Sequence, residues 1–266
     1  MFGRLTPIVK NLLYINIGIW LVQYLMKLDL GGQFGLYFIA SDNFNPIQFV
    51  TYMFLHSMSG PMHLFGNMFA LFIFGPLLEQ FLGPKKFIVL YIVTGLGAGL
   101  FYTGANYLEV SAIKNDVETF LDNPNSEEFN RLITEHNIYK AEYIYSFIDE
   151  YSRNESSPQL RQEAIQYAKG LYAFFGDYPM VGASGAVFGV LAAFGLLFPN
   201  TELFLLFIPF PIKAKYLITV YILYELFAEF QRAPGDNVAH LAHIGGAVIA
   251  FFLVTYWKKS DRRNFY

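Results

Sequence analysis

The chain has 266 residues, of which 55% are hydrophobic and 15% are charged, with no cysteine and a formal net charge of -3. Soluble domains carry closer to a quarter of charged residues, and here the apolar excess lies in long blocks typical of membrane-spanning segments. The lack of cysteine excludes disulfides, thiolate metal sites and a cysteine nucleophile, and the near-neutral charge gives no reason to expect a nucleic-acid partner.

Six stretches are candidates for transmembrane helices, because a helix needs roughly 20 mainly apolar residues to cross the hydrocarbon core. They cover residues 7–26, 61–82, 87–105, 183–198, 214–230 and 238–257. The first follows a short, mildly basic start and has no small-residue cleavage site, so we expect a span rather than a cleavable signal peptide. The fourth is short for a full crossing, which predicts a helix that begins inside the protein, below the membrane surface.

The Lys and Arg residues beside these stretches predict the orientation of the chain. With six spans, alternate loops share a side, and the side richer in Lys and Arg is normally cytoplasmic. One side has only Lys27 and Arg232 in its short loops, whereas the other has Arg4, Lys10, Lys85, Lys86, Lys213, Lys215, Lys258, Lys259, Arg262 and Arg263. We therefore expect both termini in the cytoplasm. Compact size and the lack of a targeting sequence favour a bacterial plasma membrane.

Two loops on the predicted outer side differ in character. Residues 28–60 are rich in aromatic residues and glycine, which favours a position at the membrane interface. Residues 106–178 are polar, with 13 acidic and 6 basic residues, a net charge of -7. Apolar residues recur there at helical spacing, and Ser157-Pro158 is typical of a helix start. We predict a small helical insertion, either a solvated decoration or a lid that recruits substrate.

The predicted fold class is therefore all-α: a polytopic bundle of six helices with a small extramembrane helical insertion. The membrane domain comprises residues 1–105 and 179–266, and the insertion comprises residues 106–178.

The fourth span opens with a serine among small residues, since segment 182–189 reads GASGAVFG. Gly185 and Gly189 form a small-xxx-small pair that lets helices approach closely, and a packing role is the ordinary explanation for such residues. It does not explain Gly182, which allows a tight turn before the helix. Backbone N–H groups at a helix N-terminus favour a developing negative charge, so Ser184 is a candidate nucleophile.

The sixth span opens with two histidines, since segment 239–246 reads AHLAHIGG. We expect His240 at the water interface, without a special role. His243 lies about one turn deeper, where an imidazole is costly and is a functional candidate. A histidine is the commonest activator of a serine hydroxyl, so His243 is the candidate base if the fourth and sixth spans pack together.

His63 and Asn67 lie four residues apart on one face of the second span. Acyl transfer needs hydrogen-bond donors where the carbonyl oxygen becomes an oxyanion, and both side chains can donate. A pair of polar residues that bridges helices is an equally good explanation of this spacing.

The motifs H-x-x-x-N, G-x-S-G and A-H-x-x-G occur in this order in spans two, four and six, and together they resemble the rhomboid family of intramembrane serine proteases. Segment 75–83, GPLLEQFLG, is also similar to the end of the family's second span. The resemblance covers nearly the whole membrane part. Residues Ile47-Gln48 stand where many bacterial members have Trp-Arg, and the insertion is not part of the family pattern.

This resemblance implies a serine–histidine dyad without an aspartate, in a water-filled cavity open to the extracytoplasmic side. It implies Ser184 as nucleophile, His243 as general base, and an oxyanion hole formed by the Ser184 N–H, His63 and Asn67. It also implies that Gly182 shapes the preceding loop and that Phe188 stacks on the histidine. The expected activity is cleavage of transmembrane segments of other membrane proteins, within the lipid bilayer, without a metal or another cofactor.

Two alternatives remain open from the residues alone. Inactive relatives of the rhomboid superfamily use the same fold as non-catalytic scaffolds that bind transmembrane clients. A metal site or transporter could use His240 and His243, with His56 and His63 on the same side. Against the metal site, HExxH and cysteines are absent, and we expect no acidic residue near these histidines, with Glu79 and Glu225 elsewhere.

Overall fold

The computed structural model describes residues 5–136, 142–176, 178–204, 210–231 and 239–260. Four arginines used to predict the orientation, Arg4, Arg232, Arg262 and Arg263, and the predicted start of the sixth span at 238 lie outside these ranges. The chain divides into two compact units. The first comprises Met1–Leu36, Asn45–Thr103 and Pro179–Tyr266, and the second comprises Tyr37–Phe44 and Gly104–Tyr178.

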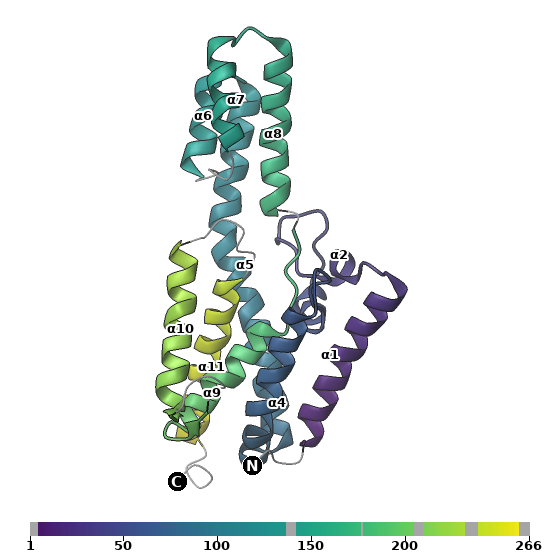
Figure 1. The fold of residues 1–266 in the computed structure, drawn as a ribbon, viewed down its shortest axis with the longest axis vertical. Coiled ribbons are helices and arrows are strands. Elements are labelled where there is room, and N and C mark those ends of the chain that lie inside the picture. The colour runs from purple at the N-terminus through teal and green to yellow at the C-terminus, as the bar shows by residue number, and fades with distance from the viewer. Residues whose placement is uncertain (1–4, 137–141, 177, 205–209, 232–238, 261–266) are drawn as a thin grey trace. The chain divides into compact units, whose positions relative to one another are not determined.

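Each predicted span overlaps a helix of the first unit (Figure 1). They are α1 (Pro7–Met26), α4 (Met62–Leu82), the first part of α5 (Pro84–Asp122), α9 (Ser184–Leu197), α10 (Ala214–Gln231) and α11 (His240–Ser260). Among the described residues, four of these helices, α1, α4, α5 and α11, are long and apolar enough to cross a membrane. α9 has 14 residues and is shorter, as expected for the fourth span. The chain is thus a polytopic all-α membrane protein.

The helix that contains the third predicted span does not end with that span near residue 105, because α5 continues to Asp122. The sequence from 105 to 122 contains neither glycine nor proline, so nothing interrupts the backbone hydrogen bonds of the helix. The polarity of this part marked the end of the span and not the end of the helix.

A buried glutamate on α4 caps the first helix. The Glu79 carboxylate accepts hydrogen bonds from the N–H groups of Ile8 and Val9, at 3.1 and 2.9 Å. These donors belong to the first turn of α1, where no partner exists within the helix and where the helix dipole favours a negative charge. The Val9 side chain packs against Gly75, so closely that a Cβ on Gly75 would meet it. This contact fixes α1 against α4.

The connections within the first unit contain short elements. Residues 28–60 include α2 (Leu30–Phe34), α3 (Gln48–Thr51) and the 3-10 helix η1 (Tyr52–Phe54). Strands β1 (Glu202–Leu203) and β2 (Ile212–Lys213) pair antiparallel between α9 and α10. Tyr52 and Met53 are fully buried, so this part of the aromatic loop belongs to the protein core rather than to the predicted membrane interface.

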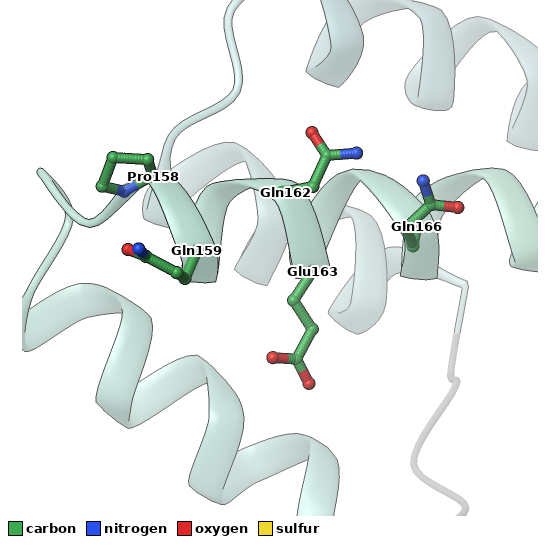
Figure 2. Close-up of a pocket in the computed structure, with 5 residues that line it drawn as sticks. All are labelled: Pro158, Gln159, Gln162, Glu163 and Gln166. Atoms are coloured by element: carbon green, nitrogen blue, oxygen red, sulfur yellow. The ribbon is translucent and has the colours of Figure 1, made fainter.

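The second unit is a helical insertion. The last part of α5 packs with α6 (Ser126–Glu135), α7 (Glu142–Arg153) and α8 (Pro158–Gly176) around one apolar core (Figure 1). This core includes Ile113, Val117, Phe120, Phe129, Leu132, Ile133, Ile144, Phe147 and Tyr151. Asn125 caps α6 by accepting from the Glu128 N–H, and Ser157 caps α8 by accepting from the Leu160 N–H. A surface hollow on this unit is lined by one helix alone, with Pro158, Gln159, Gln162, Glu163 and Gln166 along α8 (Figure 2).

Candidate active site

Ser184 is the first residue of α9, and the loop before it is anchored by backbone hydrogen bonds. Leu36 and Met180 form an antiparallel bridge, and the Gly182 N–H donates to the Tyr52 carbonyl oxygen at 3.0 Å. Gly182 has φ +142°, a conformation that side chains with a Cβ rarely adopt. The sequence therefore needs glycine here, and the turn leaves Ser184 only half-buried at the helix start.

The small residues of α9 bring it against α11 and α5. A Cβ on Gly246 would overlap the backbone carbonyl of Gly185, and one on Gly185 would meet Ala98 and the carbonyl oxygen of Ala242. One turn further along α9, a Cβ on Gly189 would overlap Thr94, which like Ala98 belongs to α5. These glycines therefore allow the close packing that the small-xxx-small pattern indicates.

His243 is held against α9 by an aromatic stack. Its ring lies parallel to that of Phe188, with centroids 4.2 Å apart and an interplanar angle of 6°. Both residues are buried, His243 at 7% and Phe188 at 4% exposed. Phe188 lies one turn after Ser184, so the stack places the imidazole beside the start of α9. Within the described residues, no hydrogen bond joins the Ser184 hydroxyl to His243.

The expectation that no carboxylate lies near His240 and His243 is wrong, because Glu225 lies beside both. Its Oε2 is 2.7 Å from His243 Nδ1 and 2.6 Å from His240 Nδ1. The residue is 3% exposed, and its side chain extends from α10, which packs on α11. The expectation failed because Glu225 is 15 residues before His240 in sequence, and only the packing of two helices brings them together.

His240 is also misplaced by the sequence analysis. It is 6% exposed, not at a water interface, and its ring meets that of His243 edge to face, with centroids 6.2 Å apart. The hydrogen bond to Glu225 offsets the cost of burying this imidazole. His240 is therefore part of the same polar cluster as His243.

Glu225, His240 and His243 could in principle hold a metal ion, because one ligand atom from each lies within 4.8 Å of the others. The two O···N distances of 2.6 and 2.7 Å are hydrogen-bond lengths. Tetrahedral zinc, with bonds of about 2.0–2.1 Å, would hold its ligand atoms roughly 3.3 Å apart. The cluster is therefore arranged as a hydrogen-bonded network.

A hydrogen bond from the loop before α4 fixes the tautomer of a neutral His63. The Ser57 N–H donates to His63 Nδ1 at 3.3 Å, so a neutral His63 carries its proton on Nε2. A Cβ on Gly182 would stand 3.0 Å from His63 Nε2 and 3.3 Å from Ser184 Oγ. The Nε2–H donor and the serine hydroxyl thus lie near the same point. Ser57 was missed in the sequence, where nothing distinguishes it from other loop serines.

Asn67 is buried, at 7% exposed, one turn after His63. Its Nδ2 donates to the His63 carbonyl oxygen at 2.9 Å, which uses one of the two amide hydrogens within α4 itself. In the part of the chain that the structure describes, the second hydrogen has no partner and can donate to a ligand. The bond to the helix backbone fixes the direction of the amide.

His56 is a further histidine beside the site. Its ring meets that of His63 edge to face, with centroids 5.2 Å apart, and it is 2% exposed. Neither ring nitrogen has a hydrogen-bond partner among the described residues. This packing supports the orientation of His63.

Comparison with known proteins gives a consistent result. The family model described as the Rhomboid domain matches residues 43–111 and 164–260, so the gap falls within the insertion. The chain is also 27% identical over 219 residues to an uncharacterized mitochondrial rhomboid protein of Schizosaccharomyces pombe. That alignment covers 77% of this chain and 49% of the relative, so the chain spans about half the length of that protein.

Proposed function

Because this chain belongs to the rhomboid family, we propose that it is an intramembrane serine endopeptidase that cleaves transmembrane segments of other membrane proteins. The observation that supports the proposal best is the meeting of three elements at one place. Ser184 begins α9, His243 stacks on Phe188 one turn later, and His63 Nε2 lies at the Gly182 turn. Nucleophile, base and oxyanion donor are the three roles that acyl transfer requires.

In the proposed reaction, Ser184 is the nucleophile and His243 is the general base. The His243 Nδ1 bonds to Glu225, so a neutral imidazole has its proton on Nδ1 and a free lone pair on Nε2. This Nε2 takes the proton of the Ser184 hydroxyl as the oxygen attacks the scissile carbonyl, and later gives it to the leaving amine. Catalytic hydrogen bonds are often longer before substrate binds, so the serine–histidine bond forms in the complex.

The proposed oxyanion hole comprises the Ser184 backbone N–H, His63 Nε2–H and the second Asn67 amide hydrogen. Ser184 is the first residue of its helix, so its N–H has no partner within the helix. Ser57 and the His63 carbonyl hold the two side chains in the protonation and direction that donation needs. Losing one such donor typically costs roughly 10²–10³ in rate.

The proposed substrate must unwind before cleavage, because the peptide groups of a transmembrane helix are already hydrogen-bonded. Small or helix-breaking residues near the cleaved bond make this easier. The Lys and Arg distribution supports cytoplasmic termini, with Ser184 reached from the opposite side.

Covalent labelling tests the proposal and separates it from a non-catalytic scaffold. The purified protein in proteoliposomes is treated with a fluorophosphonate probe and given a single-span model substrate. A protease is labelled at Ser184 and cleaves the substrate, and Ser184→Ala abolishes both. A scaffold binds the substrate without labelling or cleavage. Cleavage retained by purified Ser184→Ala would refute the serine mechanism.

A further inference from the structure

Glu225 occupies the position, relative to His243, of the third member of a catalytic triad. In soluble serine proteases a buried carboxylate accepts the Nδ1–H of the histidine and thereby holds the ring in the tautomer and direction that the serine needs. Here the Glu225 carboxylate lies 2.7 Å from His243 Nδ1. The family resemblance implies a dyad without an acidic partner, so this contact goes beyond what the resemblance implies.

We propose that Glu225 is a positioning residue for His243, so that the site works as a serine–histidine–glutamate triad. This inference rests on the proposed protease function. Glu225 acts through His243 and does not touch the substrate. It keeps the proton on Nδ1, leaves Nε2 unprotonated to receive the serine proton, and stabilises the imidazolium that forms during attack.

A hydrogen bond from His240 helps to offset the cost of burying the Glu225 carboxylate. A single buried carboxylate with one partner is costly, because its other lone pairs lose their hydration. His240 Nδ1 donates to the same Oε2 at 2.6 Å and comes from the same helix as His243. Two N–H donors therefore converge on Glu225. Phe188 covers one face of the His243 ring, so the ring is fixed from the side as well as at Nδ1.

A merely structural role would make Glu225 a hydrogen-bonded link between α10 and α11. Such a link would affect folding but not the turnover of correctly folded enzyme. Glu79 provides a matched control, since it is also a glutamate that is 3% exposed and accepts two N–H donors in the same unit, but those donors are backbone groups of α1.

The test compares Glu225→Gln, Glu225→Asp and Glu79→Gln with the wild type in proteoliposomes. Cleavage rates are divided by the fraction of folded protein, measured by thermal unfolding. In Glu225→Gln the amide can donate to Nδ1 and so favour the wrong tautomer. We expect kcat to fall on the order of 10²-fold or more with KM unchanged, since the analogous change in a soluble triad costs about 10⁴-fold.

Glu225→Asp keeps the charge but is shorter by one methylene group, so we expect it to recover part of the lost kcat. Glu79→Gln should lower the unfolding temperature and leave kcat per folded molecule at the wild-type value. The Nδ1–H proton of His243 gives a second readout, in protein labelled with ¹⁵N-histidine and assigned with His243→Ala. It should be strongly downfield in the wild type and lose this shift in Glu225→Gln.

The outcomes separate the two proposals. A wild type that neither cleaves nor reacts with the probe refutes the protease function. A wild type that cleaves, with Glu225→Gln at wild-type kcat, refutes the positioning role alone. The same holds if Glu225→Gln and Glu79→Gln lose equal activity per folded molecule. If Glu225→Gln does not fold, Glu225→Asp with wild-type kcat and an unshifted Nδ1–H signal overturns the proposal.

Discussion

Gly246 of α11 lies directly against the backbone carbonyl of Gly185 on α9, so closely that a Cβ on Gly246 would overlap it. This contact sets the separation of the helices that carry His243 and Ser184. Gly185 directly follows Ser184 in the sequence. The proposed chemistry therefore depends on the absence of a side chain at Gly246.

Gly246→Ala is expected to reduce both activity and stability. The added methyl group meets backbone rather than a flexible side chain, so the helices must separate, and overpacking of this kind typically costs about 1–3 kcal/mol. A misplacement of about 1 Å in the reacting groups can cost 10²-fold in rate. Substrate cleavage and thermal unfolding measure the two effects. Gly18→Ala in α1 is the control, because nothing lies within 4 Å of its Cβ position.

Phe188→Leu is expected to lower kcat more than it lowers substrate binding. Leucine removes the parallel ring that covers His243 and leaves a gap beside Tyr221, whose ring centroid is 4.9 Å from that of Phe188. We expect a loss on the order of 10-fold in kcat, read from cleavage kinetics. Phe188→Tyr keeps the stack and should stay within a few-fold of the wild type. An equal loss of kcat in Phe188→Leu and Phe188→Tyr would contradict a role of the ring stack in positioning His243.

His240→Phe is expected to lower kcat less than Glu225→Gln does. Phenylalanine keeps a ring beside His243 but removes one of the two donors to Glu225, and a hydrogen bond to a charged group is typically worth about 1.5–3 kcal/mol. The bond from Glu225 to His243 remains. Thermal unfolding should show a clear loss of stability, with kcat reduced less than 10-fold. A larger loss of kcat in His240→Phe than in Glu225→Gln would contradict this prediction, because His240 would then matter more to His243 than Glu225 does.

The insertion provides a prediction on pH. The pKa of the Glu155 carboxyl lies below its ordinary value of 4.5, because its Oε1 accepts from the backbone N–H and the hydroxyl of Ser126 at the start of α6. A lowered pKa means that this stabilisation is present above pH 4.5 and is lost as the pH falls through the lower, folded value.

Hydrogen exchange of the Ser126 amide in the full chain measures this effect. At neutral pH, Glu155→Gln should exchange faster than the wild type at this amide. The difference should shrink only as the pH falls through the folded pKa of Glu155, which lies below 4.5, because the wild-type carboxyl is then itself protonated. Ser152→Ala offers a control position on α7, because the Ser152 hydroxyl donates to the Asp149 carbonyl oxygen and not to Ser126 or Glu155. The prediction would be contradicted if the Ser126 amide exchange rates of the wild type and Glu155→Gln differed by the same factor at every pH.

Much of the helical architecture could be read from the sequence, because membrane helices depend on local properties. Length and apolar content indicate α1, α4 and α11, and the Ser157-Pro158 pair marks the start of α8 closely. The sequence did not show that the third span and the start of the insertion form one continuous helix, α5, because polarity reports the surroundings of a helix and not its backbone hydrogen bonds. The motifs around Ser184, His243 and His63 were recognisable as short patterns, although their roles in catalysis remain a proposal.

Contacts between distant residues could not be read in this way. Glu225, His240 and Ser57 carry no local pattern that distinguishes them from other polar residues. Glu225 and His240 were assigned to the wrong surroundings, and Ser57 was overlooked. Their partners are fixed by how α10 packs on α11 and how the loop before α4 folds back on His63. The sequence by itself determined which residues are proposed for the chemistry. Only the tertiary structure decided which hydrogen bonds fix their tautomers, because those bonds join segments whose separation in the chain says nothing of their distance in space.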